Sequence, residues 1–461
     1  MSTSAAGGVR EIARKAREAS YRMQSASTQE KNAALSAIRK ILTERKAAIC
    51  EANRGDKERA EREGGEATLR ARLNIEGDKF ESLLQGVQVL EEKTPDLVGR
   101  VNLARELTEG LNLYRISCPI GVICVVFESR PEAAVQISTL AIKSGNCVIL
   151  KGGKEAALSN EALVEAMQEG LKAAGLPPHA VQLVSTREQV GELLKLNGLI
   201  DLVVPRGSNQ LVKSVMEATS IPVLGHADGI CSVYVDEDAD LDLAVKVVVD
   251  SKCNYPAACN AAETLLVHRN ALDTILPRLG EELAKNNVTF IADGRCQMRL
   301  PADKTTPAPV GFGFDVEHLA LIMSVKCVDS LEEAIEHINT HGSHHTDVIL
   351  TKNENTAKEF CRRVDSAGVY HNCSSRFADG FRYGFGAEVG VSTNRVHARG
   401  PVGMEGLLTY KYVARGSGQC VGGMKTTDFT HRDLDSSLLN KPLNVFVTTE
   451  TSSKRAKQGS D

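Results

Sequence analysis

One cysteine in this chain has the surroundings of a nucleophile. Cys259 lies between a polar loop at 254–256 and an apolar, strand-like run at 264–267. Small residues flank it, so a substrate can approach the thiol closely: Ala257, Ala258, Ala261 and Ala262. A thiolate in such a place can accept an acyl group and present it to a hydride donor. Most free cysteines are small buried hydrophobes. The neighbouring motifs favour catalysis at Cys259 and not at four other cysteines, Cys50, Cys147, Cys361 and Cys420.

Two glycine-containing turns could hold phosphate groups. The run LKGGKE follows an expected strand, precedes an expected helix and offers Lys151 and Lys154 as cations. In the run VVPRGSNQ, Gly207 and Ser208 stand at a helix start, where unpaired N–H groups favour a pyrophosphate. Neither run is the G-x-G-x-x-G fingerprint of the usual dinucleotide fold. An ordinary exposed turn with solvated lysines is the alternative for the first.

Other histidine-rich and glycine-rich stretches have less specific interpretations. His341, His344 and His345 gather around one glycine and one serine. A pocket or packing role is favoured over a metal site, because no paired carboxylate or cysteine pattern accompanies them. The glycine-dense runs at 384–392 and 398–403 fit tight turns at a domain edge. The sequence therefore predicts no metal centre.

The bulk composition is that of a large globular protein with two or three domains. The chain has 461 residues, 42% of them hydrophobic, and no apolar run long enough to cross a bilayer. Its 55 basic and 59 acidic residues give a net charge of −4, without the basic block that nucleic-acid binding favours. The 12 cysteines show no C-x-x-C pair, as expected of reduced thiols in a cytoplasmic protein. We expect neither nucleic acid nor membrane as a partner.

The periodicity of the chain predicts helices first and two alternating α/β segments afterwards. Residues 9 to about 65 have helical periodicity and predict two helices, with Ser27 and Glu30 as a capping box before the second. Apolar strands alternate with helices from 120 to 219, beginning with the fully apolar run GVICVVF. A second alternating set from 231 to 365 carries the candidate nucleophile. This alternation predicts open, mostly parallel sheets covered by helices.

Seven long stretches, in order along the chain, resemble one family. They are GVICVVFESRPE (121–132), AIKSGNCVILKGGKEA (141–156), DLVVPRGSNQLV (201–212), CNAAETLLVH (259–268), SLEEAIEHINTHGSHHTDVI (330–349), FGAEVGVSTNRVHARGPVG (385–403) and GLLTYKY (406–412). With these motifs the chain is similar to the γ-glutamyl phosphate reductases, which lie within the aldehyde dehydrogenase superfamily. The resemblance spans nearly the whole chain up to about residue 432.

The resemblance implies roles for the nucleophile and for the two phosphate-type turns. Cys259 falls on the catalytic cysteine, and Lys151 on the lysine that holds the adenosine ribose. Lys154 stands where NAD-linked relatives carry a glutamate, which implies NADPH because a cation suits the 2′-phosphate. Glu317 falls on the glutamate that positions the nicotinamide ribose. The turn at 207–208 matches the segment over the pyrophosphate and nicotinamide.

The implied reaction is the NADPH-dependent reduction of L-glutamyl 5-phosphate to L-glutamate 5-semialdehyde and phosphate, the second step of proline biosynthesis from glutamate. It would pass through a thioester on Cys259. The anionic groups of this substrate call for bidentate cations, and Arg130, Arg376 and Arg399 lie in family motifs. A surface or interdomain salt bridge is the alternative for each arginine. The enzyme glutamate 5-kinase, on a separate chain, is the implied source of the labile acyl phosphate.

Two departures from the wider superfamily bear on the mechanism. Hydrolytic relatives have a general-base glutamate in an E-L-G-G-type strand end, where this chain reads GHADG at 225–229. A thioester that exchanges with phosphate needs no activated water, so this loss fits an acyl-phosphate reductase. Those relatives also have an oxyanion-binding Asn where this chain reads FESR at 127–130, which leaves the Cys259 backbone N–H as the candidate donor. The alternative function is a hydrolytic NAD(P)-dependent semialdehyde dehydrogenase.

The resemblance also implies an aldehyde-dehydrogenase-like α/β fold, with two Rossmann-like parallel-sheet domains and a β-hairpin oligomerisation flap. The expected cofactor-binding domain is 1–230, with a flap strand at about 101–118, and the expected catalytic domain is 231–404. A flap and return segment at 405–432 and a polar tail at 433–461 would follow. A homodimer or larger homo-oligomer is the expected assembly.

Overall fold

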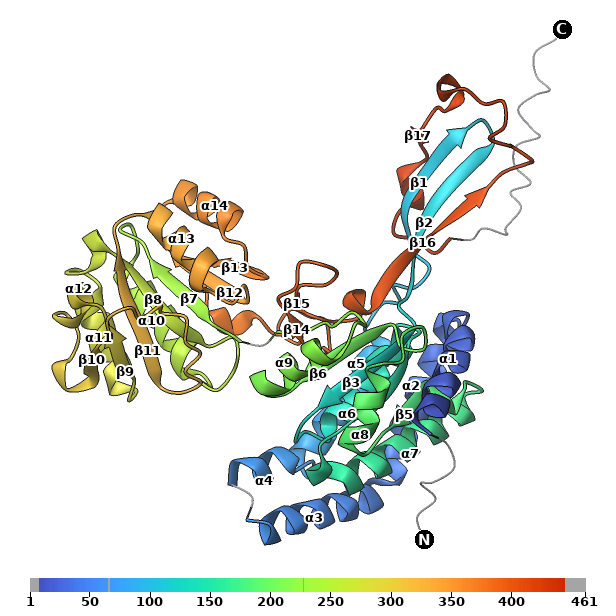
Figure 1. Ribbon diagram of the computed structural model, residues 1–461, viewed down its shortest axis with the longest axis horizontal. Helices are drawn as coiled ribbons and strands as arrows, with labels where there is room; N and C mark the ends of the chain where they lie inside the picture. The colour runs from blue at the N-terminus through green and yellow to red at the C-terminus, as the bar shows by residue number, and fades with distance from the viewer. Residues whose placement is uncertain (1–7, 65–66, 227, 444–461) are drawn as a thin grey trace. The chain divides into compact units, whose positions relative to one another are not determined.

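The computed structural model describes residues 8–64, 67–226 and 228–443, which form two units (Figure 1). Unit 1 consists of the described residues up to 94 and from 121 to 407, and unit 2 of the other described residues. The part of the predicted polar tail beyond residue 443 lies outside the described residues. All 12 cysteines lie within them and form no disulfide. No helix in these ranges combines the length and apolar character needed to cross a membrane.

Unit 1 opens with five helices. They are α1 (Val9–Gln24), α2 (Thr28–Glu44), α3 (Lys46–Arg62), α4 (Ala67–Leu73) and α5 (Asp78–Glu92). The predicted capping box is confirmed, since the Ser27 hydroxyl accepts from the Glu30 N–H at 3.2 Å and the Ser27 N–H donates to the Glu30 carboxylate at 2.8 Å. The prediction of two helices up to residue 65 was wrong, because this stretch contains three, α1, α2 and α3. The chain breaks again at Arg45, where no side-chain cap, glycine or proline marks the boundary.

A four-stranded parallel sheet of unit 1 has the order β5-β4-β3-β6. Its strands are β3 (Val122–Phe127), β4 (Cys147–Lys151), β5 (Val181–Leu183) and β6 (Leu202–Arg206). The helices that connect or follow them are α6 (Glu132–Lys143), α7 (Ala157–Ala173), α8 (Arg187–Leu193) and α9 (Asn209–Ala218). The predicted apolar strand is confirmed as β3, and every residue of β3 is buried. Such continuous burial is typical of a parallel strand covered on both faces.

A seven-stranded parallel sheet forms the remainder of the unit 1 framework, in the order β10-β9-β11-β8-β7-β12-β13. Its strands are β7 (Cys231–Val235), β8 (Ala262–His268), β9 (Thr289–Ala292), β10 (Thr305–Pro307), β11 (Ile322–Val328), β12 (Thr346–Leu350) and β13 (Gly368–His371). Its longer helices are α10 (Leu241–Cys253), α11 (Leu276–Lys285), α13 (Leu331–His341) and α14 (Glu354–Arg363), and the short α12 (Gly294–Gln297) follows β9.

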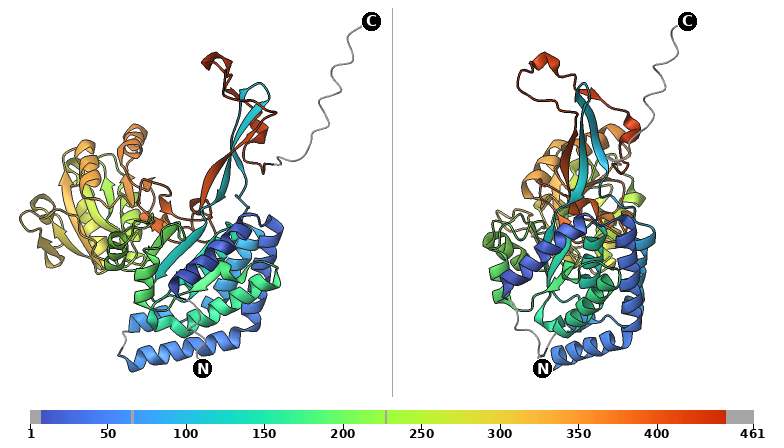
Figure 2. Two further views of the ribbon diagram at one scale, coloured as in Figure 1. Left: turned by 45° about the vertical axis from the view of Figure 1, so that its right-hand side comes forward. Right: turned by 90° about the vertical axis from the view of Figure 1, so that its right-hand side faces the viewer.

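Alternate residues of this sheet face two separate cores. Val233 and Leu265 pack with α10 and α11, whereas Tyr234 and Leu266 pack with α13 and α14. Successive side chains of a strand point to opposite faces, so the sheet is covered by helices on both sides (Figure 2, left). The predicted α/β class is therefore confirmed.

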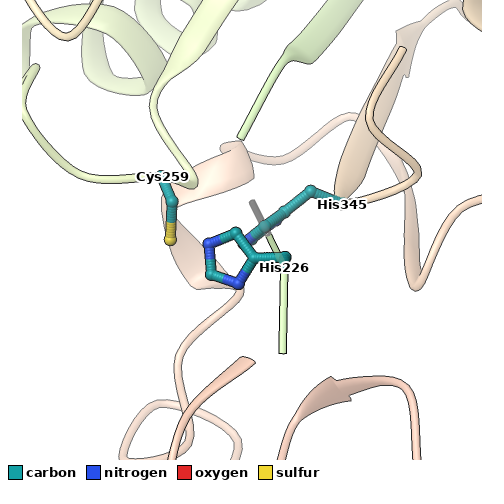
Figure 3. A group of neighbouring side chains, drawn as sticks. All are labelled: His226, Cys259 and His345. Atoms are coloured by element: carbon teal, nitrogen blue, oxygen red, sulfur yellow. The ribbon is translucent and has the colours of Figure 1, made fainter. Parts of the chain in front are cut away.

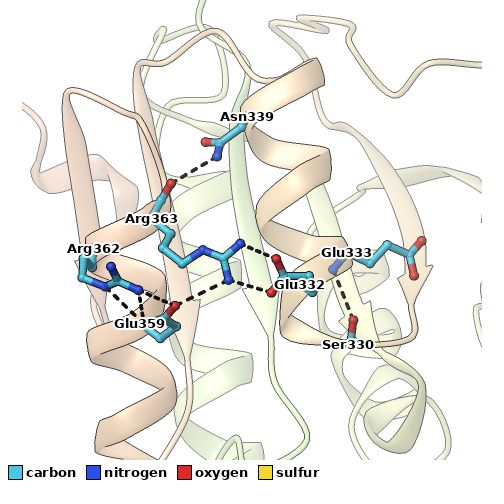
Figure 4. A network of polar contacts seen from close by, with 7 residues as sticks. All are labelled: Ser330, Glu332, Glu333, Asn339, Glu359, Arg362 and Arg363. Atoms are coloured by element: carbon cyan, nitrogen blue, oxygen red, sulfur yellow. Dashed lines mark hydrogen bonds and ion pairs between the residues drawn. The ribbon is translucent and has the colours of Figure 1, made fainter.

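Ion pairs fasten α13 to α14 and so fix the segment that leads into β12 (Figure 4). The Arg363 guanidinium of α14 bonds Glu332 of α13 at 2.6 Å, and it lies 3.5 Å from Glu359 on its own helix. The Asn339 amide of α13 donates to the Arg363 carbonyl at 3.1 Å. These ion pairs lie at the surface, where solvent screens them, so each contributes little to stability.

Unit 2 is a four-stranded antiparallel sheet in the order β16-β2-β1-β17. Its strands are β1 (Val101–Thr108), β2 (Leu111–Pro119), β16 (Leu408–Arg415) and β17 (Arg432–Asp433). The strands expected near 101–118 are thus present as the hairpin β1–β2. Strand β16 lies at an edge, with Tyr410 and Tyr412 exposed by 55% and 57%. An exposed edge strand with aromatic side chains can pair with another chain.

Candidate active site

Three neighbouring strands bring the candidate nucleophile and two histidines together. Strands β8, β7 and β12 lie side by side and run parallel, so their N-terminal ends share one edge of the sheet. Cys259 comes shortly before β8, His226 shortly before β7, and His345 directly before β12. Their side chains converge (Figure 3), and a sulfur or nitrogen atom of each lies within 4.8 Å of the other two. Chain segments far apart in sequence therefore build one polar cluster around the thiol.

Hydrogen bonds fix the path of the Cys259 segment. Tyr255 adopts a left-handed conformation with φ of 66°, which turns the chain between α10 and the cysteine. The Asn260 amide donates to the Ala378 carbonyl at 2.8 Å, and the Ser375 hydroxyl donates to the Asn260 carbonyl at 2.6 Å. Cys259 itself is half-buried. The thiol is thus accessible on a backbone that is held from both sides.

Gly229 allows the closest approach to the nucleophile. A Cβ atom built at Gly229 would lie 2.2 Å from the Cys259 carbonyl oxygen and 2.7 Å from the Cys259 Cβ. Contacts this short do not occur between real atoms, so only glycine fits here. The Gly229 N–H donates to a Glu317 carboxylate oxygen at 2.9 Å. One residue therefore touches both the predicted nucleophile and a predicted cofactor ligand.

The two imidazoles are each anchored through Nδ1. His226 Nδ1 lies 2.9 Å from the Val391 carbonyl, which can only accept, so this nitrogen carries the proton. His345 Nδ1 lies 2.9 Å from the Thr346 hydroxyl. The His345 Nε2 is buried without a hydrogen-bond partner among the described residues. The rings pack edge to face, with centroids 5.0 Å apart.

Cys231, the first residue of β7, is hydrogen-bonded to the nucleophile residue. Its thiol donates to the Cys259 carbonyl at 3.3 Å. Burial raises the pKa of Cys231 well above its usual value, and the Asp347 carboxylate adds to this effect. Cys231 is therefore a protonated structural thiol next to Cys259.

Two arginines lie close enough to Cys259 to interact with its charge. Burial lowers the pKa of Arg376, and a negative charge on Cys259 opposes that shift. The Arg376 Nε is buried without a hydrogen-bond partner among the described residues. Burial also lowers the pKa of Arg206. The negative charges of Glu388 and of a Cys259 thiolate oppose this shift. The Arg206 guanidinium donates to the Glu388 carbonyl at 3.1 Å.

The other two candidate arginines have different surroundings. Arg130 is exposed. Its positive charge lowers the pKa of Arg206, as burial also does, so the two guanidinium groups are near each other. Arg399 donates to an Asp365 carboxylate oxygen at 2.8 Å, and Arg395 bonds the same carboxylate. This salt bridge is the alternative role that the sequence leaves open for Arg399.

The turn after β4 places two lysines next to two glycines. Lys151 ends β4, and Lys154 is an exposed cation close to the start of α7. A Cβ atom at Gly152 would lie 2.0 Å from the Asn160 amide nitrogen. Glycine at this position thus lets the strand end pack tightly against α7. These residues fit the adenosine side of a phosphorylated dinucleotide.

At the start of α9, a serine cap and a carboxylate accept hydrogen bonds from backbone N–H groups. Ser208 caps the helix, its hydroxyl accepting from the Leu211 N–H at 3.4 Å. The Glu128 carboxylate accepts from the Ser208 N–H at 3.1 Å, and a Cβ atom at Gly207 would lie 2.5 Å from the same carboxylate. A carboxylate already uses this donor, so the chemistry suits a phosphate oxygen in its place.

Glu317 lies in a strained loop held by β8. Its second oxygen accepts from the Asn209 amide of α9 at 3.2 Å. The loop contains two left-handed residues, Phe314 with φ of 57° and Leu319 with φ of 53°. The Thr264 hydroxyl donates to the Phe314 carbonyl at 3.2 Å. Strained residues of this kind persist only where the surroundings hold them, as at functional sites.

Sequence reasoning missed His226 and Arg206, and it gave His345 only a pocket or packing role. His226 lies in the GHADG run, and a histidine there is itself a signal for proton transfer. His345 was predicted to serve a pocket or packing role together with His341 and His344. The structure separates them, since His344 Nδ1 bonds the Asp365 carbonyl while His345 faces Cys259. No local pattern distinguishes Arg206.

Comparisons with known proteins agree with this fold. The aldehyde dehydrogenase family model matches residues 1–298. The γ-glutamyl phosphate reductase of Acetivibrio thermocellus is 48% identical over 429 residues, covering 93% of this chain and 98% of that protein. The γ-glutamyl phosphate reductase 1 of Synechocystis is 49% identical over 426 residues, covering 92% and 97%.

Solved structures give the same result. The γ-glutamyl phosphate reductase of Thermotoga maritima superposes with a TM-score of 0.87 at 39% identity, covering 90% of this chain and all of that one. An engineered glycolyl-CoA reductase with bound NADP+ has a TM-score of 0.62 at 17% identity, a likeness of fold alone. The chain therefore belongs to the aldehyde dehydrogenase family, and it is an oxidoreductase. Within that family it belongs to the γ-glutamyl phosphate reductases.

Proposed function

We propose that this enzyme reduces L-glutamyl 5-phosphate to L-glutamate 5-semialdehyde with NADPH, through a thioester on Cys259. The single observation that carries the proposal is the surroundings of Cys259. The thiol is half-buried, two imidazoles lie within 4.8 Å of it, and Arg376 and Arg206 interact with its charge. The names of relatives 48% and 49% identical support the same substrate.

In the first step, the Cys259 thiolate attacks the acyl carbon and the carbon–oxygen bond to phosphate breaks. His226 or His345 can take the thiol proton, because each has an imidazole nitrogen near the sulfur. Phosphate is a good leaving group and needs no acid. When bound, NADPH supplies the hydride that reduces the thioester. The carbon–sulfur bond then breaks, and the thiolate returns as the semialdehyde leaves.

Arginine side chains recognise the anionic substrate. The buried Arg376 and the half-buried Arg206 supply guanidinium groups that interact with the charge of Cys259, and Arg130 adds a third charge near Arg206. Such groups bind phosphate and carboxylate bidentately, which orients the acyl carbon toward the sulfur. Arg399 is less well placed for this role, because Asp365 holds it.

The cofactor is held by the two phosphate-type turns and by Glu317. Lys151 and Lys154 receive the adenosine ribose and its 2′-phosphate, and the exposure of Lys154 supports NADPH over NADH. The 207–208 turn receives the pyrophosphate once the Glu128 carboxylate moves away. Glu317, fixed by Gly229 and Asn209, positions the nicotinamide ribose.

We assign a cofactor-binding and a catalytic domain to the two parallel sheets. Strands β3 to β6 precede residue 231 and belong to the cofactor-binding domain, and β7 to β13 form the catalytic domain up to 404. We assign oligomerisation to unit 2, whose edge strand β16 exposes two tyrosines. The reaction supplies proline biosynthesis, since the product closes to a cyclic imine, and a glutamate 5-kinase must provide the labile acyl phosphate.

A hydrolytic semialdehyde dehydrogenase is the second candidate. The observation that favours it is His226, whose imidazole lies beside Cys259 and could activate water against a thioester. In that case the enzyme would oxidise the semialdehyde to glutamate without phosphate. The resemblance to acyl-phosphate reductases favours the first candidate.

The reverse reaction separates these two functions. L-Glutamate 5-semialdehyde and NADP+ are supplied, and NADPH formation is followed with and without inorganic phosphate. Strict dependence on phosphate is expected, because phosphate must resolve the thioester. Equal rates without phosphate would replace the proposal with the hydrolytic function. Cys259→Ala should lose at least about a thousandfold in rate while retaining NADPH affinity, and the exposed Cys420→Ala serves as the matched control.

A further inference from the structure

The cluster around the nucleophile has the composition of a metal site as well as of a catalytic one. Cys259, His226 and His345 offer one sulfur and two imidazole ligands from three separate segments, and the atoms lie within 4.8 Å of one another. Thiolate and imidazole are the ligands that zinc prefers in proteins. The sequence predicts no metal cofactor, so an ion bound here would play another role.

Both histidines present the nitrogen that a metal requires. The Nδ1 of His226 donates to the Val391 carbonyl, which leaves Nε2 with a lone pair. The Nδ1 of His345 bonds the Thr346 hydroxyl, and its buried Nε2 has no partner among the described residues. Metal-binding histidines almost always anchor their second nitrogen in this way. The unpartnered Nε2 of a fully buried His345 is the observation that points to a ligand.

The spacing needs only a small contraction to hold zinc. In a tetrahedral site with bonds of about 2.0 to 2.3 Å, ligand atoms are about 3.5 Å apart. The three atoms, now within 4.8 Å, would each shift by about 1 Å or less through side-chain rotation. Both Cys259 and His226 are half-buried, so a water molecule can reach the fourth position. Three protein ligands with one open position are typical of an accessible zinc site.

We infer that Cys259, His226 and His345 form an inhibitory zinc site that closes on the nucleophile. The ion bonds the Cys259 sulfur, the thiol proton passes to solvent, and the sulfur lone pair no longer attacks an acyl carbon. Loss of activity rests on the proposed function, whereas binding of the ion rests on geometry alone. Zinc and the acyl phosphate should therefore exclude each other.

Binding is tested first without turnover. The full-length, reduced, metal-free protein is titrated with Co2+, and its absorption spectrum is recorded. One ion per chain is expected, with a thiolate-to-cobalt charge-transfer band and intense visible bands of a tetrahedral ion. Zinc should displace it, and competition with a chromogenic chelator gives the zinc affinity. Absence of the charge-transfer band would overturn the inference, whatever the phosphate experiment shows.

Variants then identify the ligands. Cys259→Ser, His226→Ala and His345→Ala should each weaken zinc binding by at least about tenfold, and Cys259→Ser should also abolish the charge-transfer band. The matched controls Cys420→Ser and His431→Ala, both exposed in unit 2, should bind as the unaltered protein does. Because His345 is fully buried, His345→Gln provides a second variant, and thermal unfolding checks that each variant folds.

The final measurement connects binding with activity. Micromolar zinc should inhibit the unaltered enzyme, EDTA should restore it, and saturating acyl phosphate should reduce inhibition. Unchanged binding in all of the ligand variants would overturn the assigned site. Inhibition that persists in EDTA, or that acyl phosphate does not reduce, would overturn the assigned competition at Cys259.

Discussion

Lys252 and Glu263 form an ion pair of 2.6 Å in which both side chains are fully buried. Lys252 lies on the last turn of α10 and Glu263 on β8, so the pair spans the segment that carries Cys259. The other Glu263 oxygen accepts from the Leu319 N–H at 3.1 Å. Burial raises the pKa of Glu263 to about 7 and lowers that of Lys252, and mutual attraction opposes both shifts. The pair thus connects the nucleophile segment to the loop that carries Glu317.

Breaking this buried pair should destabilise the enzyme strongly. Lys252→Met or Glu263→Gln leaves an unpaired polar or charged partner in the interior, so each should lower the free energy of unfolding by about 3–5 kcal/mol. The double variant should cost clearly less than the sum, because no buried charge then remains unpaired. Urea unfolding of the four proteins measures this coupling. Additive losses would show that the two groups do not stabilise one another.

A surface ion pair provides the comparison for these four unfolding measurements. Arg363 and Glu332 join α13 to α14 while largely exposed (Figure 4). In the same experiment, Glu332→Gln should lower the free energy of unfolding far less than Lys252→Met or Glu263→Gln does, because solvent screens the surface pair.

Asp347 should make stability depend on pH. It is fully buried, accepts from the Ser232 N–H at 2.8 Å and from the Ser366 hydroxyl at 2.5 Å, and burial raises its pKa from 3.8 to about 6. The folded protein holds this proton more tightly than the unfolded one. The stability that protonated Asp347 contributes is therefore complete below pH 3.8 and is lost as pH rises through about 6.

Asp347→Asn tests this sign, because the amide keeps the shape without ionising. Relative to the unaltered protein, the variant should gain on the order of 3 kcal/mol as pH rises from about 4 to about 7. Urea unfolding at several pH values measures the difference. A difference that stays constant over this range would contradict the assignment.

Lys154 should set the choice between NADPH and NADH. Lys154→Glu replaces an exposed cation at the predicted 2′-phosphate position by a group that repels phosphate and can bind ribose hydroxyls. The ratio of kcat/KM for the two coenzymes should move toward NADH by about tenfold to a hundredfold. Lys172→Glu, at the other end of α7, is the matched control and should leave the ratio unchanged.

Arg376 and Arg399 should differ in what their loss affects. Arg376→Lys removes a bidentate group beside Cys259 and should raise KM for L-glutamyl 5-phosphate about tenfold or more, with little change in the unfolding midpoint. Arg399→Lys should leave KM almost unchanged, because Arg399 pairs with Asp365 at 2.8 Å. Initial-rate kinetics and thermal unfolding of both variants decide the matter. A large increase in KM for Arg399→Lys would show instead that Arg399 binds the substrate.

The elements of this fold could be predicted where local chemistry decides them. Strand β3 is apolar throughout, and the Ser27–Glu30 box marks the start of α2, so both are confirmed. The break at Arg45 has no such signal, because no side-chain cap, glycine or proline marks it. The Cys259 segment was recognisable from its small neighbours and from its place before β8.

The composition of the site could be predicted only in part, because it depends on strand order. Nothing local in the sequence shows that β8, β7 and β12 are adjacent, and this adjacency brings His226 and His345 to Cys259. The cofactor-type residues are easier to find, since Lys151 and Lys154 lie in one continuous turn. Contacts between distant segments, such as Arg206 with the charge of Cys259, require the folded chain.

The tight packing at Gly229 has a consequence for protein engineering. Its missing side chain leaves no space beside the Cys259 backbone, whereas the adjacent Asp228 bonds two polar groups of α9, Asn209 and Lys213. Position 228 should therefore tolerate substitution, whereas the next position, 229, should not. A variant library that seeks a wider acyl pocket should keep position 229 fixed and vary position 228. Even Gly229→Ala would place a methyl group against the backbone and Cβ of Cys259.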